Sequence, residues 1–250
     1  LLGWYLVDEP EGIGKAKPDQ VQELNKLVKE LDPNHPTALV IMNPKPAAGY
    51  FDCADITWTD PYPIPKWSVN VVKHWVGDAV AIAGPNRPVW AIPQAHDLNV
   101  WRTGKIVDEH RPTDGEERCM TYLALTHGAK GIIYWAHTAS RYYIRDYPEH
   151  WEYMKKLAGE LRDLSPVLLT TSLPAPAFEP ASAPLSTMMK VHDGSIYVFA
   201  VNRDKAPHKI AFRLPKAAQP KGEVLFEKRS ISAENGVLTD EFDALEVHVY

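Results

Sequence analysis

Apolar and polar residues follow two different patterns along the chain. In the first part, short apolar runs typical of buried strands alternate with segments in which apolar residues recur at helical spacing. Five such runs stand in the segments 3–9, 37–43, 56–62, 88–94 and 131–135. Strands that alternate with helices favour βαβ units and a parallel sheet covered on both faces.

The helical segments between these runs have recognisable ends. Pro18 suits the first turn of a helix that Pro33 stops, and Thr113 and Glu116 have the spacing of a capping box. A last helix with one apolar stripe closes the series at Pro166. The pattern up to this point predicts about five βα units.

The pattern changes after Pro166. The stretch TTSLPAPAFEPASAPL is rich in Pro, Ala and Ser and is predicted to be a linker or loop. Short strand-like runs follow it, with hairpin-type turns at Asp193-Gly194 and Asn235-Gly236. We therefore predict an α/β chain with a partial (β/α)8 TIM barrel over residues 1–168, followed by a small antiparallel β-sandwich over residues 169–250.

Composition and charge narrow the class of protein. With 45% hydrophobic and 24% charged residues, the chain has an ordinary globular composition. A net charge of −5 without basic blocks argues against nucleic acid as a partner, and no apolar run is long enough for a transmembrane helix. Cys53 and Cys119 lack the spacing of a zinc site. The sequence does not decide between a cytoplasmic and a secreted protein.

Polar and aromatic residues stand at the C-terminal ends of the five apolar runs. They are Asp8 and Glu9, Asn43, Asp60 and Tyr62, Gln94, and Trp135. In a (β/α) barrel these strand ends form the edge at which active sites are built. His96 and Arg141 lie beyond strand ends and are further candidates for contacting a ligand. Neither a metal-binding spacing nor a nucleophilic serine elbow is found among these residues.

Four stretches together resemble a known family. LLGWYLVDEPEG, ITWTDPYPIP, VWAIPQAH and MTYLALTHGAKGIIYWAH are similar to clan A glycoside hydrolases, in particular the β-galactosidase-like and GH42-like barrels. The resemblance extends to Pro166 and identifies the five strands with strands four to eight of an eight-stranded barrel. It implies a carbohydrate substrate and no cofactor. It also implies that Glu9 is the general acid/base, that Tyr62 contacts the nucleophile and that Trp135 floors the sugar subsite.

Two positions depart from the pattern of that family. Asp8 stands where an Asn usually binds the sugar 2-hydroxyl, and the nucleophile position falls on Gln94, which cannot form a glycosyl ester. Because glycoside hydrolysis needs two carboxylates, the second is left open among Asp8, Asp60 and Asp97. The functional prediction is therefore a glycosidase with Glu9 as its acid. The alternatives are a non-catalytic carbohydrate-binding or scaffold protein derived from one, and a hydrolase of another bond type.

Five strands alone would leave the sheet open at its first strand. Unpaired strand edges tend to pair or aggregate, and eight strands are needed to close a barrel of this type. We expect a partner to cover the open edge, either a second copy in a symmetric dimer or an N-terminal half of the barrel.

Overall fold

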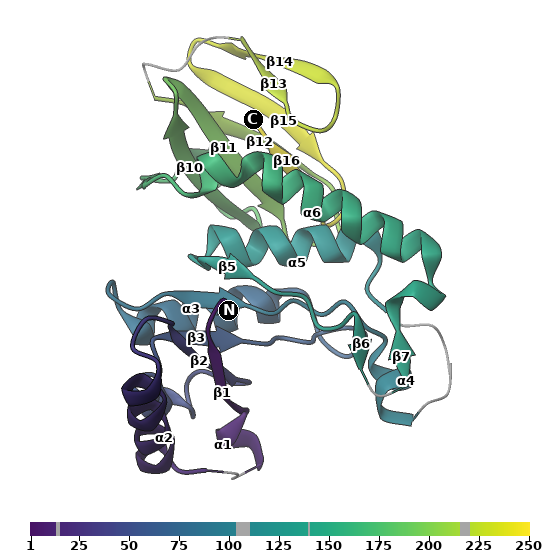
Figure 1. Ribbon diagram of the computed structural model, residues 1–250. Helices are drawn as coiled ribbons and strands as arrows, with labels where there is room; N and C mark the ends of the chain where they lie inside the picture. Colours follow the sequence, from purple (N-terminus) through teal and green to yellow (C-terminus); the bar gives the residue numbers. More distant parts are fainter. Residues whose placement is uncertain (14–15, 104–110, 140, 216–220) are drawn as a thin grey trace. The chain divides into compact units, whose positions relative to one another are not determined.

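The computed structural model describes residues 1–13, 16–103, 111–139, 141–215 and 221–250 (Figure 1). Its contacts divide the chain into two units, one formed by Leu1–Pro112 with His127–Tyr143 and the other by Thr113–Thr126 with Ile144–Tyr250. The helix before residue 127 and the helix that ends at residue 168 thus group with the antiparallel strands, which they contact. The domain boundary at residue 168 stays a prediction.

The first unit is built on a parallel sheet whose spatial order follows the chain. Its strands are β1 (Trp4–Asp8), β2 (Thr37–Ile41), β3 (Ile56–Thr59), β4 (Val89–Ala91) and β5 (Gly131–Ile132), in the order β1-β2-β3-β4-β5. Each neighbouring pair is parallel, so the C-terminal ends of all five strands lie along one edge. This arrangement confirms the partial, barrel-like parallel sheet predicted from the sequence.

Short crossover elements connect these strands. They are α1 (Pro10–Ile13), α2 (Pro18–Leu31), η1 (Ala48–Tyr50), α3 (Asn70–Ala83) and α4 (Leu98–Thr103), and a small hairpin of β6 (Thr138–Ala139) and β7 (Tyr142–Tyr143) follows β5. Helix α2 begins at Pro18, as expected, and the Gln20 carboxamide oxygen accepts a hydrogen bond from the Lys17 backbone N–H at 2.8 Å. Helix α3 ends before Gly84, whose φ of 69° suits glycine.

The two faces of the parallel sheet differ in character. On one face Leu39, Ile41 and Val89 form a buried apolar cluster with Val21 of α2 and Ala79 of α3. Because strand side chains alternate between faces, the intervening residues point the other way. This burial holds α2 and α3 against the sheet.

An aromatic stack spans the second face. The Tyr5 and Trp58 rings are stacked with centroids 5.5 Å apart, and the Trp58 and Trp90 rings with centroids 5.7 Å apart. Gly131 on β5 pairs with Trp90, and a Cβ atom there would collide with the indole ring. The stack therefore requires a glycine on the neighbouring strand.

The second unit combines two helices with two antiparallel sheets. The helices are α5 (Asp114–Thr126) and α6 (Pro148–Leu168), with η2 (Ile144–Asp146) before α6. One sheet has the order β16-β11-β10-β8 and the other β13-β14-β15-β12-β9. The strands are β8 (Ser172–Leu173), β9 (Ala177–Glu179), β10 (Leu185–His192), β11 (Ser195–Asn202), β12 (His208–Arg213), β13 (Lys221–Val224), β14 (Arg229–Glu234), β15 (Val237–Phe242) and β16 (Val247–Val249). Buried residues of β10, β11, β12 and β15 share one apolar cluster.

Both predicted hairpin turns are confirmed. Asp193-Gly194 joins β10 to β11 and Asn235-Gly236 joins β14 to β15, and all four residues have positive φ, as a type I′ turn requires. The loop predicted over 170–185 is wrong in part, because β8 and β9 lie within it. Both are edge strands, where proline-rich sequence is tolerated because one side of the backbone needs no donor.

Taken together, the two units confirm the predicted class, a mixed α/β chain whose barrel-like parallel sheet is followed by antiparallel sheets. Among the described residues, no helix has the length and apolar character needed to cross a membrane.

Candidate functional site

The site lies at the C-terminal edge of the parallel sheet and is built around Glu9. Strand β1 ends at Asp8, and Glu9 turns out of it with a φ of 40°, in the left-handed region that is unusual for a residue with a side chain. Two backbone hydrogen bonds hold this turn: Glu9 N–H donates to the Val40 carbonyl at 3.0 Å, and Gly12 N–H donates to the Glu9 carbonyl at 3.2 Å. The Glu9 side chain is half-buried. The local backbone thus fixes the carboxyl at the strand end.

Asp60, directly after β3, is the buried carboxyl of the site. Asp60 is 4% exposed, and its Oδ1 has no hydrogen-bond partner among the described residues. Burial raises the pKa of the Asp60 carboxyl well above its ordinary value, and the charge of Glu9 and a hydrogen bond with Glu9 raise it further, against a hydrogen bond from Tyr62. The structure therefore brings Glu9 and Asp60 together and favours a proton on Asp60.

Tyr62 completes this group of three. Burial, followed by the negative charge of Asp60, raises the pKa of its phenol well above the ordinary value, so the hydroxyl stays protonated and can donate. The edge of the His96 ring packs at right angles to the Tyr62 ring, with centroids 4.9 Å apart. His96 itself is fully buried, and its Nδ1 lies 2.9 Å from the Trp135 carbonyl oxygen. The structure places His96 behind Tyr62.

Asp8 occupies a more open position beside the same group. It is exposed, and its Oδ1 accepts a hydrogen bond of 2.5 Å from the Tyr5 hydroxyl. Burial and this hydrogen bond raise the pKa of Tyr5. The negative charge of Asp8 also contributes to the raised pKa values of Asp60 and Tyr62, which places it in the same electrostatic cluster.

Glu11 belongs to the site although the sequence pattern did not single it out. Its Oε1 accepts hydrogen bonds from the backbone N–H groups of Met42 at 2.6 Å and Asn43 at 3.3 Å, beyond the end of β2. Its Oε2 is buried without a hydrogen-bond partner among the described residues. Burial raises the pKa of Glu11, those backbone bonds oppose the rise, and the charge of Glu9 adds to it. No spacing in the sequence indicates this reach from α1 to the end of the second strand.

Gln94 and Asn43 are engaged mainly through backbone. The buried Gln94 carboxamide accepts from the Ile64 N–H at 2.9 Å and donates to the Ile64 and His96 carbonyls at 2.8 and 3.0 Å. Both of its N–H donors are thus used by loop backbone, and the side chain holds the loop after β3 in place. Asn43 is half-buried at the end of β2, with its backbone N–H directed to Glu11.

The remaining candidates, Trp135, Asp97 and Arg141, follow β4 in the chain. Trp135 bridges to Gln94 and is 42% exposed, so it offers a large apolar surface to solvent. Asp97 caps α4, because its Oδ1 accepts the N–H groups of Asn99 and Val100 at 2.7 and 3.1 Å. Arg141 is exposed between β6 and β7.

The chain is similar to several solved structures. Neither a protein-family model nor a curated protein sequence matches it. A GH30 endoxylanase from Clostridium papyrosolvens aligns with all of the chain at a TM-score of 0.60 and 13% identity. An α-amylase from Anoxybacillus aligns equally fully at a TM-score of 0.64 and 14% identity, and an acarbose complex of a Geobacillus thermoleovorans α-amylase at 0.64 and 12%. The chain spans 58–64% of the length of these three proteins. At this level of identity the likeness shows a shared fold alone.

Proposed function

We propose that the chain is a glycoside hydrolase-like protein that acts on carbohydrate at the C-terminal edge of its parallel sheet. The observation that carries this proposal is the pair of carboxyls formed by Glu9 and Asp60, one half-buried and one buried. Two neighbouring carboxyls in different surroundings are the arrangement that glycosidases use for acid/base work. The sequence resemblance favours the β-galactosidase-like branch.

The two carboxyls act together in this proposal. Burial, and next the charge of Glu9, raise the pKa of Asp60, so Asp60 holds a proton beside Glu9. Asp60 is too buried to reach a substrate, whereas Glu9 is half-buried at the rim. In this proposal the Asp60 proton passes along the hydrogen bond to Glu9, and Glu9 delivers it to the glycosidic oxygen, which leaves Asp60 ionised. The charge of Asp8 contributes to the field around the pair.

The remaining residues bind or position in this proposal. The exposed Trp135 ring is a platform for the apolar face of a sugar, and Tyr62 donates from its protonated hydroxyl. Asn43 contacts the sugar from the neighbouring strand end. The Gln94 and His96 side chains position these groups through their contacts with backbone groups of Ile64 and Trp135.

A second candidate function is carbohydrate binding without hydrolysis. The observation that favours it is the end of β4, where the nucleophile position holds Gln94 and the nearby Asp97 caps a helix. Without a carboxylate there, a retaining mechanism has no nucleophile. In this version Trp135 and Tyr62 remain the sugar contacts.

A panel of nitrophenyl glycosides, galactosides first, separates the two candidates. In the catalytic case Glu9→Gln lowers kcat by about 10²–10⁴-fold, the usual contribution of a general acid. The matched control Glu30→Gln alters an exposed residue of α2 and leaves kcat unchanged. Equal activity of wild type and Glu9→Gln would contradict the role of Glu9. An inactive wild type that binds immobilised polysaccharide, and loses binding on Trp135→Ala, would support the binding function.

We further propose that a second polypeptide segment covers the open edge at β1. This strand ends the sheet order, and Trp4 and Tyr5 are 41% and 50% exposed. A second copy of the chain or an N-terminal half of a barrel fits this position. Sedimentation of the chain as a monomer would exclude the second copy.

A further inference from the structure

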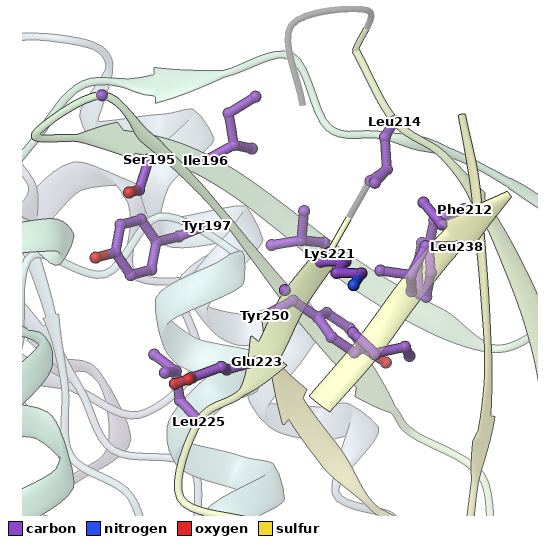
Figure 2. A pocket seen from close by; sticks show the side chains of 15 residues that line it. Ser195, Ile196, Tyr197, Phe212, Leu214, Lys221, Glu223, Leu225, Leu238 and Tyr250 are labelled. Carbon is purple, nitrogen blue, oxygen red and sulfur yellow. The ribbon is translucent and has the colours of Figure 1, made fainter. Parts of the chain in front are cut away.

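The second unit contains two cavities that differ in character. The larger, of about 280 Å³, lies among the antiparallel strands and is lined mainly by apolar side chains such as Phe212 and Leu238 (Figure 2). The smaller, of about 190 Å³, is lined by residues of α5, of α6 and of the turn that joins β13 to β14. We call it the polar pocket, because most of its lining side chains are charged: Arg118, Lys156, Glu160 and Glu227. At about 30 Å³ per water molecule it has room for roughly six waters, which suits a ligand of one small ring.

A fixed ion pair lies at the buried side of the polar pocket. Glu160 Oε1 accepts hydrogen bonds from Arg118 Nε at 3.0 Å, from Arg118 Nη2 at 2.7 Å and from the Tyr122 hydroxyl at 2.5 Å. A third Arg118 N–H donates to the Val247 carbonyl. An arginine has five N–H groups, so two of them are left without a partner among the described residues, and Glu160 Oε2 accepts a single long bond of 3.3 Å there. The pair therefore offers a ligand both donors and an acceptor, on side chains that are already held in place.

An exposed phenyl ring lines the same pocket. Phe226 is 44% exposed and has a φ of 68°, in the left-handed region where a bulky residue is an outlier. Two backbone hydrogen bonds hold its turn: Leu225 N–H donates to the Val249 carbonyl at 2.7 Å, and Glu227 N–H donates to the Val224 carbonyl at 3.3 Å. Residues held in such a conformation are found at ligand-binding sites, where function offsets the strain. A ring with strained backbone and a solvent-exposed face is better explained by a ligand than by packing.

The remaining lining residues supply hydrogen-bonding groups of both kinds. Tyr153 and Lys156 lie on the face of α6 that lines the pocket. Burial raises the pKa of the Tyr153 phenol, so its hydroxyl stays protonated and can both donate and accept. The Glu227 carboxylate is held by Arg229, whose Nε donates to it at 2.7 Å. Two positive and two negative side chains line the pocket, so charge favours neither an anion nor a cation as its ligand.

From these features we infer that the polar pocket is a second carbohydrate site, which binds one neutral sugar ring. A sugar hydroxyl donates and accepts at once, which matches the mixture of donors and acceptors on Arg118, Glu160 and Tyr153. The apolar C–H face of the ring packs on the Phe226 phenyl. All lining residues belong to the second unit, so the inference goes beyond the proposed action of the strand-end carboxyls and does not depend on it.

An NMR titration of the isotope-labelled full chain tests this inference. The probes are glucose, galactose and mannose. We expect the Phe226 and Lys156 amide signals to shift with at least one of them, while the amide of Gly194, in the turn between β10 and β11, stays unchanged. The uronic acid and the amino sugar of the same series should bind at least about fivefold more weakly, because the pocket holds carboxylates and cations that repel them. Absence of a Phe226 shift with all three sugars would overturn the inference, and tighter binding of a charged analogue would overturn the assignment of a neutral ligand.

A pair of glycine variants separates a ligand contact from a packing role. Phe226→Gly removes the ring and the backbone strain together, so it should weaken sugar binding about tenfold while the midpoint of thermal unfolding stays or rises. Lys228→Gly relieves a φ of 55° in the same turn and keeps the ring, so binding should change by less than about twofold. Equal loss of binding in both variants, or a lower unfolding midpoint in Phe226→Gly, would show that the ring acts by packing and would overturn the inference.

A second pair of variants locates the bound sugar. Lys156→Met should weaken binding about fivefold, because it removes a lining donor. The neighbouring Lys155, which pairs with Glu152 at 2.6 Å, does not line the pocket, so Lys155→Met should bind as wild type. Glu9→Gln should leave the Phe226 shift unchanged even if hydrolysis is lost or never present. Loss of the shift in Glu9→Gln, or equal binding by the two lysine variants, would place the sugar elsewhere and overturn the inference.

Discussion

Asp60 in the parallel-sheet unit and Asp240 in the antiparallel unit are both poorly exposed carboxyls, yet their surroundings act in opposite directions. Asp60 meets the carboxyl of Glu9, and burial raises its pKa. Asp240 is also subject to burial, but hydrogen bonds from Arg229 and Tyr250 lower its pKa. Arg229 donates to both oxygens of Asp240, at 3.2 and 2.7 Å, and to Glu227 at 2.7 Å.

The difference is that the charged form of Asp240 stabilises the fold, whereas the charged form of Asp60 would destabilise it. A carboxylate with a two-pronged arginine partner and a phenol donor is compensated for the loss of water. A carboxyl beside another carboxyl is not, and such uncompensated groups are found where function requires them. The contrast distinguishes Asp240, whose donors stabilise its charged form, from Asp60, whose surroundings favour its protonated form.

Arg229→Met should have the largest effect on stability. It leaves Asp240 and Glu227 without their cation, and hydrogen bonds to charged groups contribute about 1.5–3 kcal/mol, here reduced because the Arg229 side chain is 35% exposed. We expect the free energy of unfolding to fall by about 2 kcal/mol at pH 7 in urea denaturation. The pKa of Asp240 is lowered on folding, so its contribution exists above the unfolded pKa and disappears as the pH falls through the folded pKa. The deficit should therefore shrink in acid.

Arg229→Lys is the matched control for that prediction. It keeps the positive charge and loses the two-pronged geometry, so it should retain part of the stability. A deficit of the same size at pH 7 and at low pH would show that Arg229 contributes by packing, and the contrast with Asp60 would then fail.

Asp60→Asn should have an intermediate effect of the opposite sign. Because folding raises the pKa of Asp60, the wild type loses stability as the pH rises from the unfolded pKa towards the folded pKa. The asparagine does not ionise, so the variant should gain about 1 kcal/mol relative to wild type between acid and pH 8. Urea denaturation at a series of pH values measures this difference. A variant that is destabilised most at high pH would show that Asp60 is ionised and paired.

Glu11→Gln should have the smallest effect. The carboxamide oxygen can still accept from the Met42 and Asn43 N–H groups, so the free energy of unfolding should change by less than about 0.5 kcal/mol. Glu11→Ala removes the acceptor and should cost about 1 kcal/mol. Thermal unfolding of the two variants side by side gives the comparison, and equal losses would mean that the backbone contacts of Glu11 do not stabilise the strand ends.

Much of the fold follows from local sequence, because local rules decide those parts. Paired positive-φ residues determine the hairpins at Asp193-Gly194 and Asn235-Gly236, and the Thr113 hydroxyl and Glu116 carboxylate form the predicted capping box at 3.2 and 2.9 Å. Helix α6 extends two residues past Pro166, beyond the predicted stop. The Ser165 hydroxyl donates to the Arg162 carbonyl, the acceptor that a proline at 166 leaves without its backbone donor. The sequence alone did not indicate that the Ser165 hydroxyl would replace the backbone N–H that Pro166 lacks.

For the candidate site, the sequence predicted some of the residues that lie together and few of their contacts. The strand-end rule located Glu9, Asp60 and Tyr62, which the structure brings together. It could not show that the Gln94 amide is engaged by loop backbone or that Glu11 reaches the end of β2, because both depend on contacts between segments about 30 residues apart. Contacts between segments so far apart in the chain are determined by tertiary packing and leave no local sequence pattern.

The left-handed backbone at Glu9 has a consequence for how this chain would respond to selection. A residue with a side chain held at a φ of 40° costs of the order of 1–3 kcal/mol, which a glycine would largely avoid. Directed evolution for thermal resistance alone would therefore favour glycine at position 9 and remove the carboxyl that the rim presents. If glutamate were retained at position 9 under selection for thermal resistance, the carboxyl would contribute more to stability than the backbone strain costs.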